Sequence, residues 1–183
     1  MRKTWIAMAL AGALGIASPL AAETYLSLKD ALKLLLPAGQ KYFKLDISLT
    51  EDQAKTLNTK WDNGGFSKGD PFTLYYAKDE SGKVTGMAME MTEILLKYSA
   101  SHTWVIGVGP DLRLTGVSMV EITNDHAYGL SSKAFQAQFA GKDPAALRLG
   151  KGVDAVSGAT DSSQLLIDSA QKVLYLISQY PPK

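Results

Sequence analysis

Apolar residues recur at helical spacing near both ends of the chain. The face of the first predicted helix consists of Leu28, Ala31, Leu32, Leu35 and Leu36. Ser27 is suited to the N-cap of this helix and Pro37 ends it. The last predicted helix runs from about Asp161 to Gln179. Its apolar face consists of Leu166, Ala170, Val173, Leu174 and Ile177.

Two shorter helices are predicted from their capping residues. Thr50 begins one, and Gln53 stands three residues later, where it completes a capping box. Ser131 or Ser132 caps the other, which ends at Gly141.

Apolar and polar residues alternate over 43–49, which predicts a half-buried strand, and four further segments between the helices also have the composition of strands. The predicted strands span residues 43–49, 72–77, 84–94, 103–109 and 114–122, and residues 63–71 form a loop. Residues 78–83 and the Pro110-Asp111 pair join successive strands as hairpins. Because hairpins make antiparallel pairs, the prediction is an α+β fold: a mainly antiparallel sheet with helices packed on it, in a single domain.

Composition narrows the possible functions. The chain has 183 residues, with 19 Lys and Arg against 18 Asp and Glu, so its formal net charge is +1. Such a balance argues against binding to nucleic acid. Cysteine is absent, which excludes disulfides, cysteine-ligated metal clusters and thioether-attached haem.

The first 22 residues have the pattern of a signal peptide. Arg2 and Lys3 precede an apolar stretch from Trp5 to Ile16, and a small-residue segment ends at Ala22. The alternative is an uncleaved membrane anchor, but the apolar run is short for a bilayer span. We therefore expect a signal peptide at 1–22, a domain at 23–183, and a periplasmic location in a Gram-negative host.

A loop of small residues with hydroxyls at its end precedes the last helix. Helix N-termini bind phosphate through free N–H groups and a partial positive charge, and glycine allows a ligand to approach closely. On these local features alone, an ordinary glycine turn followed by hydroxyl caps is favoured. The loop includes Asp154, Ser157, Gly158, Ala159 and Thr160.

Residues 154–160 read Asp-Ala-Val-Ser-Gly-Ala-Thr. This resembles the Asp-x-x-Ser-Gly-Ala-Thr motif of the FMN-binding domain family. That family includes the C subunit of the sodium-pumping NADH:quinone reductase and the G subunit of Rnf complexes. Flanking residues 147–151 and 162–163 also resemble the family, and the resemblance covers about residues 80 to 180.

The resemblance implies a covalent cofactor. In the family, a flavin transferase uses FAD and a divalent metal to join FMN to the motif's threonine by a phosphodiester, and that threonine is Thr160 here. It also places the loop from His126 to Leu130, which includes Tyr128 and Gly129, against the flavin. Tyr128 is a candidate for stacking on the ring, although packing on the sheet is an equal alternative. Asp161 departs from the family pattern, in which a small or hydroxyl residue is expected at this position, and a carboxylate beside a phosphodiester is unfavourable.

The expected function is therefore that of an exported electron carrier, not an enzyme by itself. It would pass electrons between a cytochrome, a quinone-linked membrane complex or a flavin reductase and a periplasmic or extracellular acceptor. The alternative is a non-redox module that binds flavin or another phosphorylated ligand. No metal site or catalytic residue is predicted. His102 and His126 are expected on the surface or in loops, and Met87, Met89 and Met91 in the core.

Overall fold

The computed structural model describes residues 23–61, 65–123 and 125–182. The predicted signal peptide and positions 63 and 64 of the predicted loop lie outside these residues. The elements are β1 (Glu23–Thr24), α1 (Leu28–Leu35), β2 (Lys41–Ser48), α2 (Glu51–Lys60), β3 (Pro71–Lys78), β4 (Val84–Leu95), the 3₁₀ turn η1 (Leu96–Tyr98), β5 (Ala100–Val108), β6 (Leu114–Ile122), the 3₁₀ turn η2 (Asp125–Ser131), α3 (Lys133–Ala137) and α4 (Thr160–Gln179).

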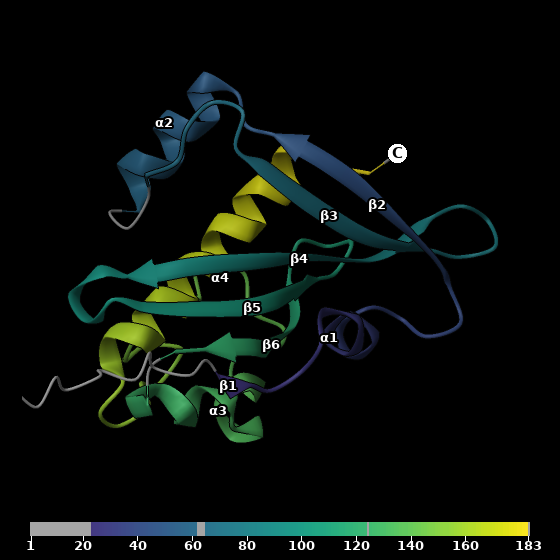
Figure 1. Cartoon of the computed structure of the whole chain (residues 1–183). Coiled ribbons are helices and arrows are strands. Elements are labelled where there is room, and N and C mark those ends of the chain that lie inside the picture. The colour runs from purple at the N-terminus through teal and green to yellow at the C-terminus, as the bar shows by residue number, and fades with distance from the viewer. Residues whose placement is uncertain (1–22, 62–64, 124, 183) are drawn as a thin grey trace, which may run out of the picture.

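The described strands form one antiparallel sheet in the order β1-β6-β5-β4-β3-β2 (Figure 1). Strands β2 to β6 follow one another in sequence, and each pairs with the next. Short connections between successive strands dictate this meander. The predicted α+β class with a mainly antiparallel sheet is confirmed.

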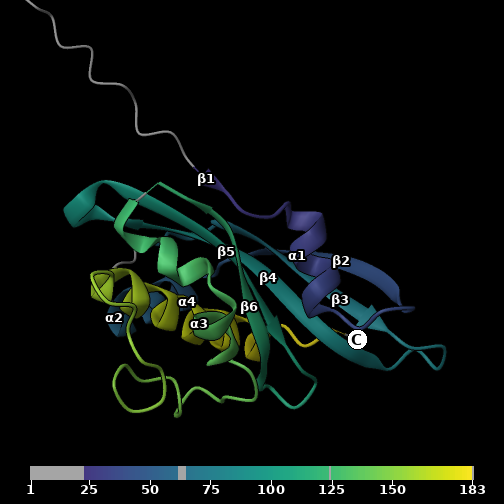
Figure 2. The ribbon, with the colours of Figure 1, turned by 90° about the horizontal axis from the view of Figure 1, so that it is seen from below.

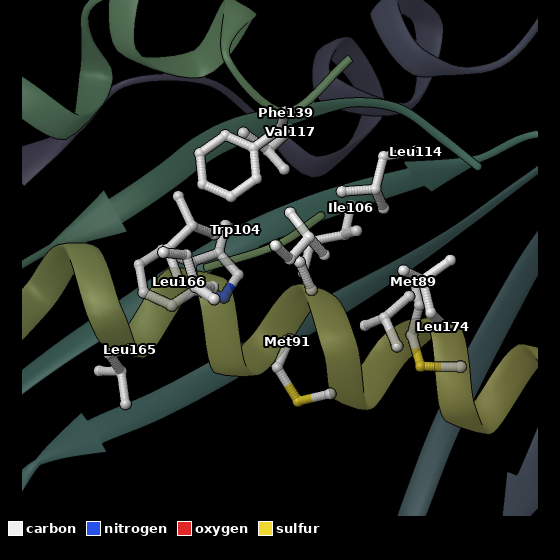
Figure 3. Close-up of a cluster of buried hydrophobic side chains, with 14 of the residues drawn as sticks. Met89, Met91, Trp104, Ile106, Leu114, Val117, Phe139, Leu165, Leu166 and Leu174 are labelled. Atoms are coloured by element: carbon white, nitrogen blue, oxygen red, sulfur yellow. The ribbon is translucent and has the colours of Figure 1, made fainter. Parts of the chain in front are cut away.

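Helices cover both faces of the sheet. Helix α4 crosses one face together with α3, whereas α1 lies on the other (Figure 2). The larger core fills the space between the sheet and α4, where Met89, Trp104 and Leu166 are buried (Figure 3). The three predicted core methionines of β4 are all buried on this face.

Glycines let α1 approach the opposite face closely. A Cβ atom added to Gly86 of β4 would lie 2.6 Å from Cδ of Pro37, and one added to Gly107 of β5 would lie 3.0 Å from Cβ of Leu35. A side chain at either position would therefore displace α1 or the segment that follows it. Ser27 caps α1 as predicted, because its hydroxyl accepts a hydrogen bond from the Asp30 N–H at 3.1 Å.

The structure also corrects two predictions about burial. Phe43 and Leu45 alternate as expected, but both are exposed because β2 is an edge strand and only its far end is covered. His102 was expected on the surface or in a loop, and it is instead fully buried in β5. Its position two residues before Trp104 places it on the sheet face that α4 covers.

Within the described part of the chain, no helix combines the length and apolarity that crossing a membrane requires. The longest helix, α4, has 20 residues but includes charged and polar side chains such as Asp168, Gln171 and Lys172.

Candidate functional site

Thr160 is exposed at the first position of α4. The first backbone hydrogen bond of this helix runs from the Ser163 N–H to the Ala159 carbonyl at 2.9 Å. The preceding N–H groups, of Thr160, Asp161 and Ser162, have no acceptor one turn earlier in the helix. They give this end of α4 a partial positive charge beside the Thr160 hydroxyl. The arrangement suits an anionic group attached to Thr160 or lying next to it.

The loop before Thr160 is held by the helix that follows it. The Ser163 hydroxyl accepts a hydrogen bond from the Val156 N–H at 3.1 Å and donates one to the Ala159 carbonyl at 2.9 Å. Gly158 has a φ of +78°, a left-handed conformation that favours glycine. The small residues of the motif therefore form a tight turn that leads directly into α4.

Asp154 is fixed through its backbone. Its N–H donates to Oε1 of Gln138 at 2.8 Å, and its carbonyl accepts from Nε2 of the same side chain at 3.4 Å. Gln138 is the C-cap of α3, so the start of the motif is tied to that helix. Asp154 and Ser157 are both exposed.

A hollow of about 230 Å³ opens beside the motif. Its lining residues are Tyr98, His126, Gly158, Ala159, Thr160, Asp161 and Ser162. The structure thus brings three predicted site residues together at the start of α4. Tyr98 was not predicted, because only the fold places η1 beside Thr160. His126 belongs to the loop at 126–130 that the family resemblance placed against the flavin, although His126 itself was expected only as a surface or loop residue.

The hairpin between β4 and β5 carries η1 to the start of α4. Nζ of Lys97 lies 3.0 Å from Oδ2 of Asp161. The neighbouring Tyr98 is 51% exposed, so its ring is accessible at the hollow. Ser99 ends the turn in a left-handed conformation with a φ of 48°, and the chain then returns along β5.

His102 lies beneath the first turn of α4. Its Nε2 is 3.0 Å from the Ser162 hydroxyl, and both side chains are buried. Burial lowers the pKa of His102 to about 4, against a smaller opposing effect of the Ala100 backbone. The imidazole is therefore neutral at physiological pH. Its hydrogen bond to Ser162 connects the first turn of α4 to β5.

The predicted residues of η2 have different environments. Tyr128 is 45% exposed, whereas Leu130 is fully buried in the main core. A Cβ atom on Gly129 would collide with Cγ1 of Val156, which belongs to the motif. Gly129 therefore permits close packing between η2 and the motif loop. Tyr128 and His126 share an exposed turn next to α4.

Among the residues that the structure describes, no group of three His, Asp or Glu side chains is arranged to hold a metal ion. The chemistry that the site offers is instead an accessible hydroxyl at a positive helix end, with the ring of Tyr98 lining the same hollow. Such a site can carry an esterified phosphate whose attached group lies against Tyr98, whereas the predicted Tyr128 does not line the hollow.

No family model matches the chain. It is 28% identical over 170 residues to the G subunit of the ion-translocating oxidoreductase complex of Methanosarcina acetivorans, and the match covers 89% of this chain and 88% of that protein. The crystal structure of Shewanella oneidensis NqrC matches with a TM-score of 0.54 at 17% identity, covering 80% of this chain and 81% of NqrC. The chain is thus similar over most of its length to the G subunit of an ion-translocating oxidoreductase complex and has the fold of NqrC, which agrees with its resemblance to the FMN-binding domain family.

Proposed function

We propose that this protein is an exported electron carrier with FMN joined to Thr160 by a phosphodiester. The observation that supports the proposal most directly is the position of the motif's last residue. Thr160 is exposed, begins α4 and lines the hollow. A flavin transferase would supply the FMN from FAD, as the motif implies.

The residues of the site fit FMN. The phosphate would lie at the positive end of α4, where the N–H groups of the first turn are directed. The ring would extend toward Tyr98 and Tyr128, which expose about half of their surface and are suited to stacking. FMN would supply the redox chemistry, and the protein would set its orientation and exposure.

A tethered organic cofactor also suits the rest of the sequence. Without cysteine, the chain has no ligands for an iron–sulfur cluster. If residues 1–22 direct export, FMN lost outside the cytoplasm could not readily be replaced. A covalent bond removes dissociation altogether.

The proposed role as a carrier agrees with the relative in M. acetivorans, whose name describes a subunit of an ion-translocating oxidoreductase complex. Exposed aromatic residues at the site would leave the flavin near the surface, where a redox partner can approach. The partners that we propose are a membrane complex or a cytochrome on one side and a periplasmic or extracellular acceptor on the other. Any reductase activity would then depend on these partners.

The attachment site can be tested by intact-mass measurement after co-expression with a flavin transferase. The wild-type protein should gain the mass of FMN less water. Thr160→Ala should gain nothing, whereas Thr59→Ala, which alters an exposed threonine on α2, should be modified like wild type. A covalent flavin on Thr160→Ala would contradict the assignment.

Electron transfer needs a separate experiment. Stopped-flow reduction of the modified protein by a candidate cytochrome or quinol system should be fast, and the reduced flavin should be reoxidised by an acceptor. A flavin that stays oxidised with every such donor would favour the alternative of a non-redox binding module. Export is tested by N-terminal sequencing of protein from the periplasmic fraction, where we expect a chain that begins at Glu23.

A further inference from the structure

The residue after the proposed attachment site carries the same charge as a phosphate. Asp161 is exposed in the first turn of α4, and its carboxylate lies beside the hollow that Thr160 lines. An anion delivered to Thr160 therefore meets a second anion at the adjacent position. Without a compensating charge, this repulsion would oppose attachment of FMN.

A cation from a distant part of the sequence is in place to offset this charge. Nζ of Lys97, at the tip of the β4–β5 hairpin, lies 3.0 Å from Oδ2 of Asp161. We propose that Lys97 is a positioning residue for FMN attachment, which neutralises Asp161 and draws the flavin phosphate to Thr160. This inference rests on the proposed function of Thr160 as the attachment site.

The hairpin holds Lys97 at this place. The pairing of Leu95 with Ala100 closes the strands immediately around η1, so Lys97 has little freedom along the chain. Nζ of Lys97 also lies 5.0 Å from the centre of the Tyr98 ring, within the range of a cation–π contact. The Tyr98 and Asp161 side chains raise the pKa of Lys97, so its ammonium group stays charged.

The ion pair is suited to exchange its partner. The Lys97 side chain is 66% exposed and that of Asp161 is 45% exposed. Exposed pairs of this kind are weak, because water competes for both charges. The flexible lysine stem can therefore turn its ammonium group from Asp161 to an incoming phosphate without a large cost. A buried pair would lack this freedom.

The attachment step balances as a phosphoryl-group transfer. The Thr160 oxygen forms a bond to the phosphorus on the FMN half of FAD. The bond between that phosphorus and the bridging oxygen breaks, and AMP leaves with this oxygen. The hydroxyl proton of Thr160 passes to a base on the transferase or to water, and no group is oxidised or reduced. Lys97 takes no part in bond making; it lowers the repulsion while the pyrophosphate approaches.

The test is a cycle of variants measured by intact mass during modification by purified transferase, FAD and Mg²⁺. Lys97→Met should slow FMN incorporation about fivefold, the ratio expected from an exposed charge interaction. In the Asp161→Ser background the same change should slow it only about twofold, because the repulsion is already absent and only the attraction of Lys97 for the phosphate is lost. Lys97→Arg should retain most of the rate. Lys133→Met, which removes an exposed lysine from α3, should match wild type.

Salt dependence separates an electrostatic role from a structural one. The difference between wild type and Lys97→Met should shrink as salt rises, since exposed charges are screened. Equal rates for these two proteins at low salt would overturn the inference alone, as would an equal loss in both backgrounds. A wild-type protein that acquires no FMN would overturn the proposed function and this inference with it.

Discussion

The His102 imidazole and the Ser162 hydroxyl form a buried hydrogen bond of 3.0 Å between β5 and the first turn of α4. Ser162 lies two residues after Thr160, so this bond anchors the turn that carries the attachment site. The His102 ring also packs against Trp104, with 5.5 Å between the ring centres. A charged imidazole would be poorly solvated at this place.

The stability of the protein should therefore fall as the pH drops from 7 to 5. The pKa of His102 is lowered to about 4 in the folded state, against 6.5 as its ordinary value. Between these values the unfolded chain binds a proton and the folded chain does not, so stability rises with pH over this window. Urea unfolding should show a loss of about 2 kcal/mol from His102 between pH 7 and pH 5.

Other groups titrate in the same range, so the His102 contribution is obtained by difference. Burial raises the pKa values of Glu93 and Asp168. These carboxyls therefore make the stability fall as the pH rises, which is opposite to the effect of His102. His102→Gln should be less sensitive to acid than wild type by about 2 kcal/mol over this interval. His126→Gln, which alters an exposed histidine, should keep the wild-type dependence. The same dependence in His102→Gln would show that the imidazole is not buried neutral.

A second prediction concerns the buried ion pair between Lys172 of α4 and Glu93 of β4. Nζ of Lys172 lies 2.6 Å from Oε1 of Glu93, and the two side chains are 0% and 5% exposed. The Ser169 hydroxyl donates to the same oxygen at 3.3 Å. Removing one partner leaves the other charge buried, so Glu93→Gln should lower the free energy of unfolding by about 3–5 kcal/mol.

Replacing both charges should restore much of this stability. The double variant Glu93→Leu/Lys172→Met leaves no isolated charge, and apolar side chains of similar size can fill the space. Lys33→Met removes a partner from the exposed pair with Asp30, and it should change the free energy of unfolding by less than about 1 kcal/mol. Urea unfolding of the four proteins measures these effects. A double variant no more stable than Glu93→Gln would contradict the prediction.

Most elements of the fold could be predicted because their signals are local. The capping box of Thr50 and Gln53 is present, and the apolar face predicted for α4 is buried. The burial of a side chain depends on which element packs on its strand, and a local sequence pattern does not show this. The alternation through Met91 also includes Glu93, and the alternation through Trp104 includes His102. Continuing each period of two would have placed both polar residues on the covered face.

The candidate site could be predicted only where it is continuous in sequence. The motif at residues 154–160 indicated the site, and Thr160 lies where a helix N-terminus was expected. Lys97 and Tyr98 have no motif, and their place at the site follows from the β4–β5 hairpin. His126 lies in the η2 loop, which the family resemblance had already placed against the flavin. The ion pair between Asp161 and Lys97 could not be predicted either, because the two residues are 64 positions apart in the sequence.

A third prediction tests the contact between η2 and the motif loop. Gly129 packs so closely on Val156 that an added Cβ would collide with its side chain. Gly129→Ala should therefore destabilise the protein by about 1–3 kcal/mol and slow FMN incorporation, since the motif must shift. The double variant Gly129→Ala/Val156→Ala should lose less free energy of unfolding than the sum of the losses in the two single variants. Strictly additive losses would show that the two residues do not share this space.

The last prediction separates the backbone role of Gly158 from its role at the hollow. Gly158 and Gly141 have φ values of +78° and +76°, and an added Cβ would meet nothing within 4 Å at either position. Alanine at each should thus cost a similar amount of stability, about 1 kcal/mol, from backbone strain alone. Only Gly158 lines the hollow beside Thr160, so only Gly158→Ala places a methyl group where the phosphate would approach.

Intact-mass kinetics should therefore show slower FMN incorporation for Gly158→Ala than for Gly141→Ala, although urea unfolding finds the two equally destabilised. The motif's glycine is then required for two reasons that this pair of variants distinguishes: the left-handed turn and the open approach to the Thr160 hydroxyl. Equal incorporation rates in the two variants would leave the turn as its sole contribution.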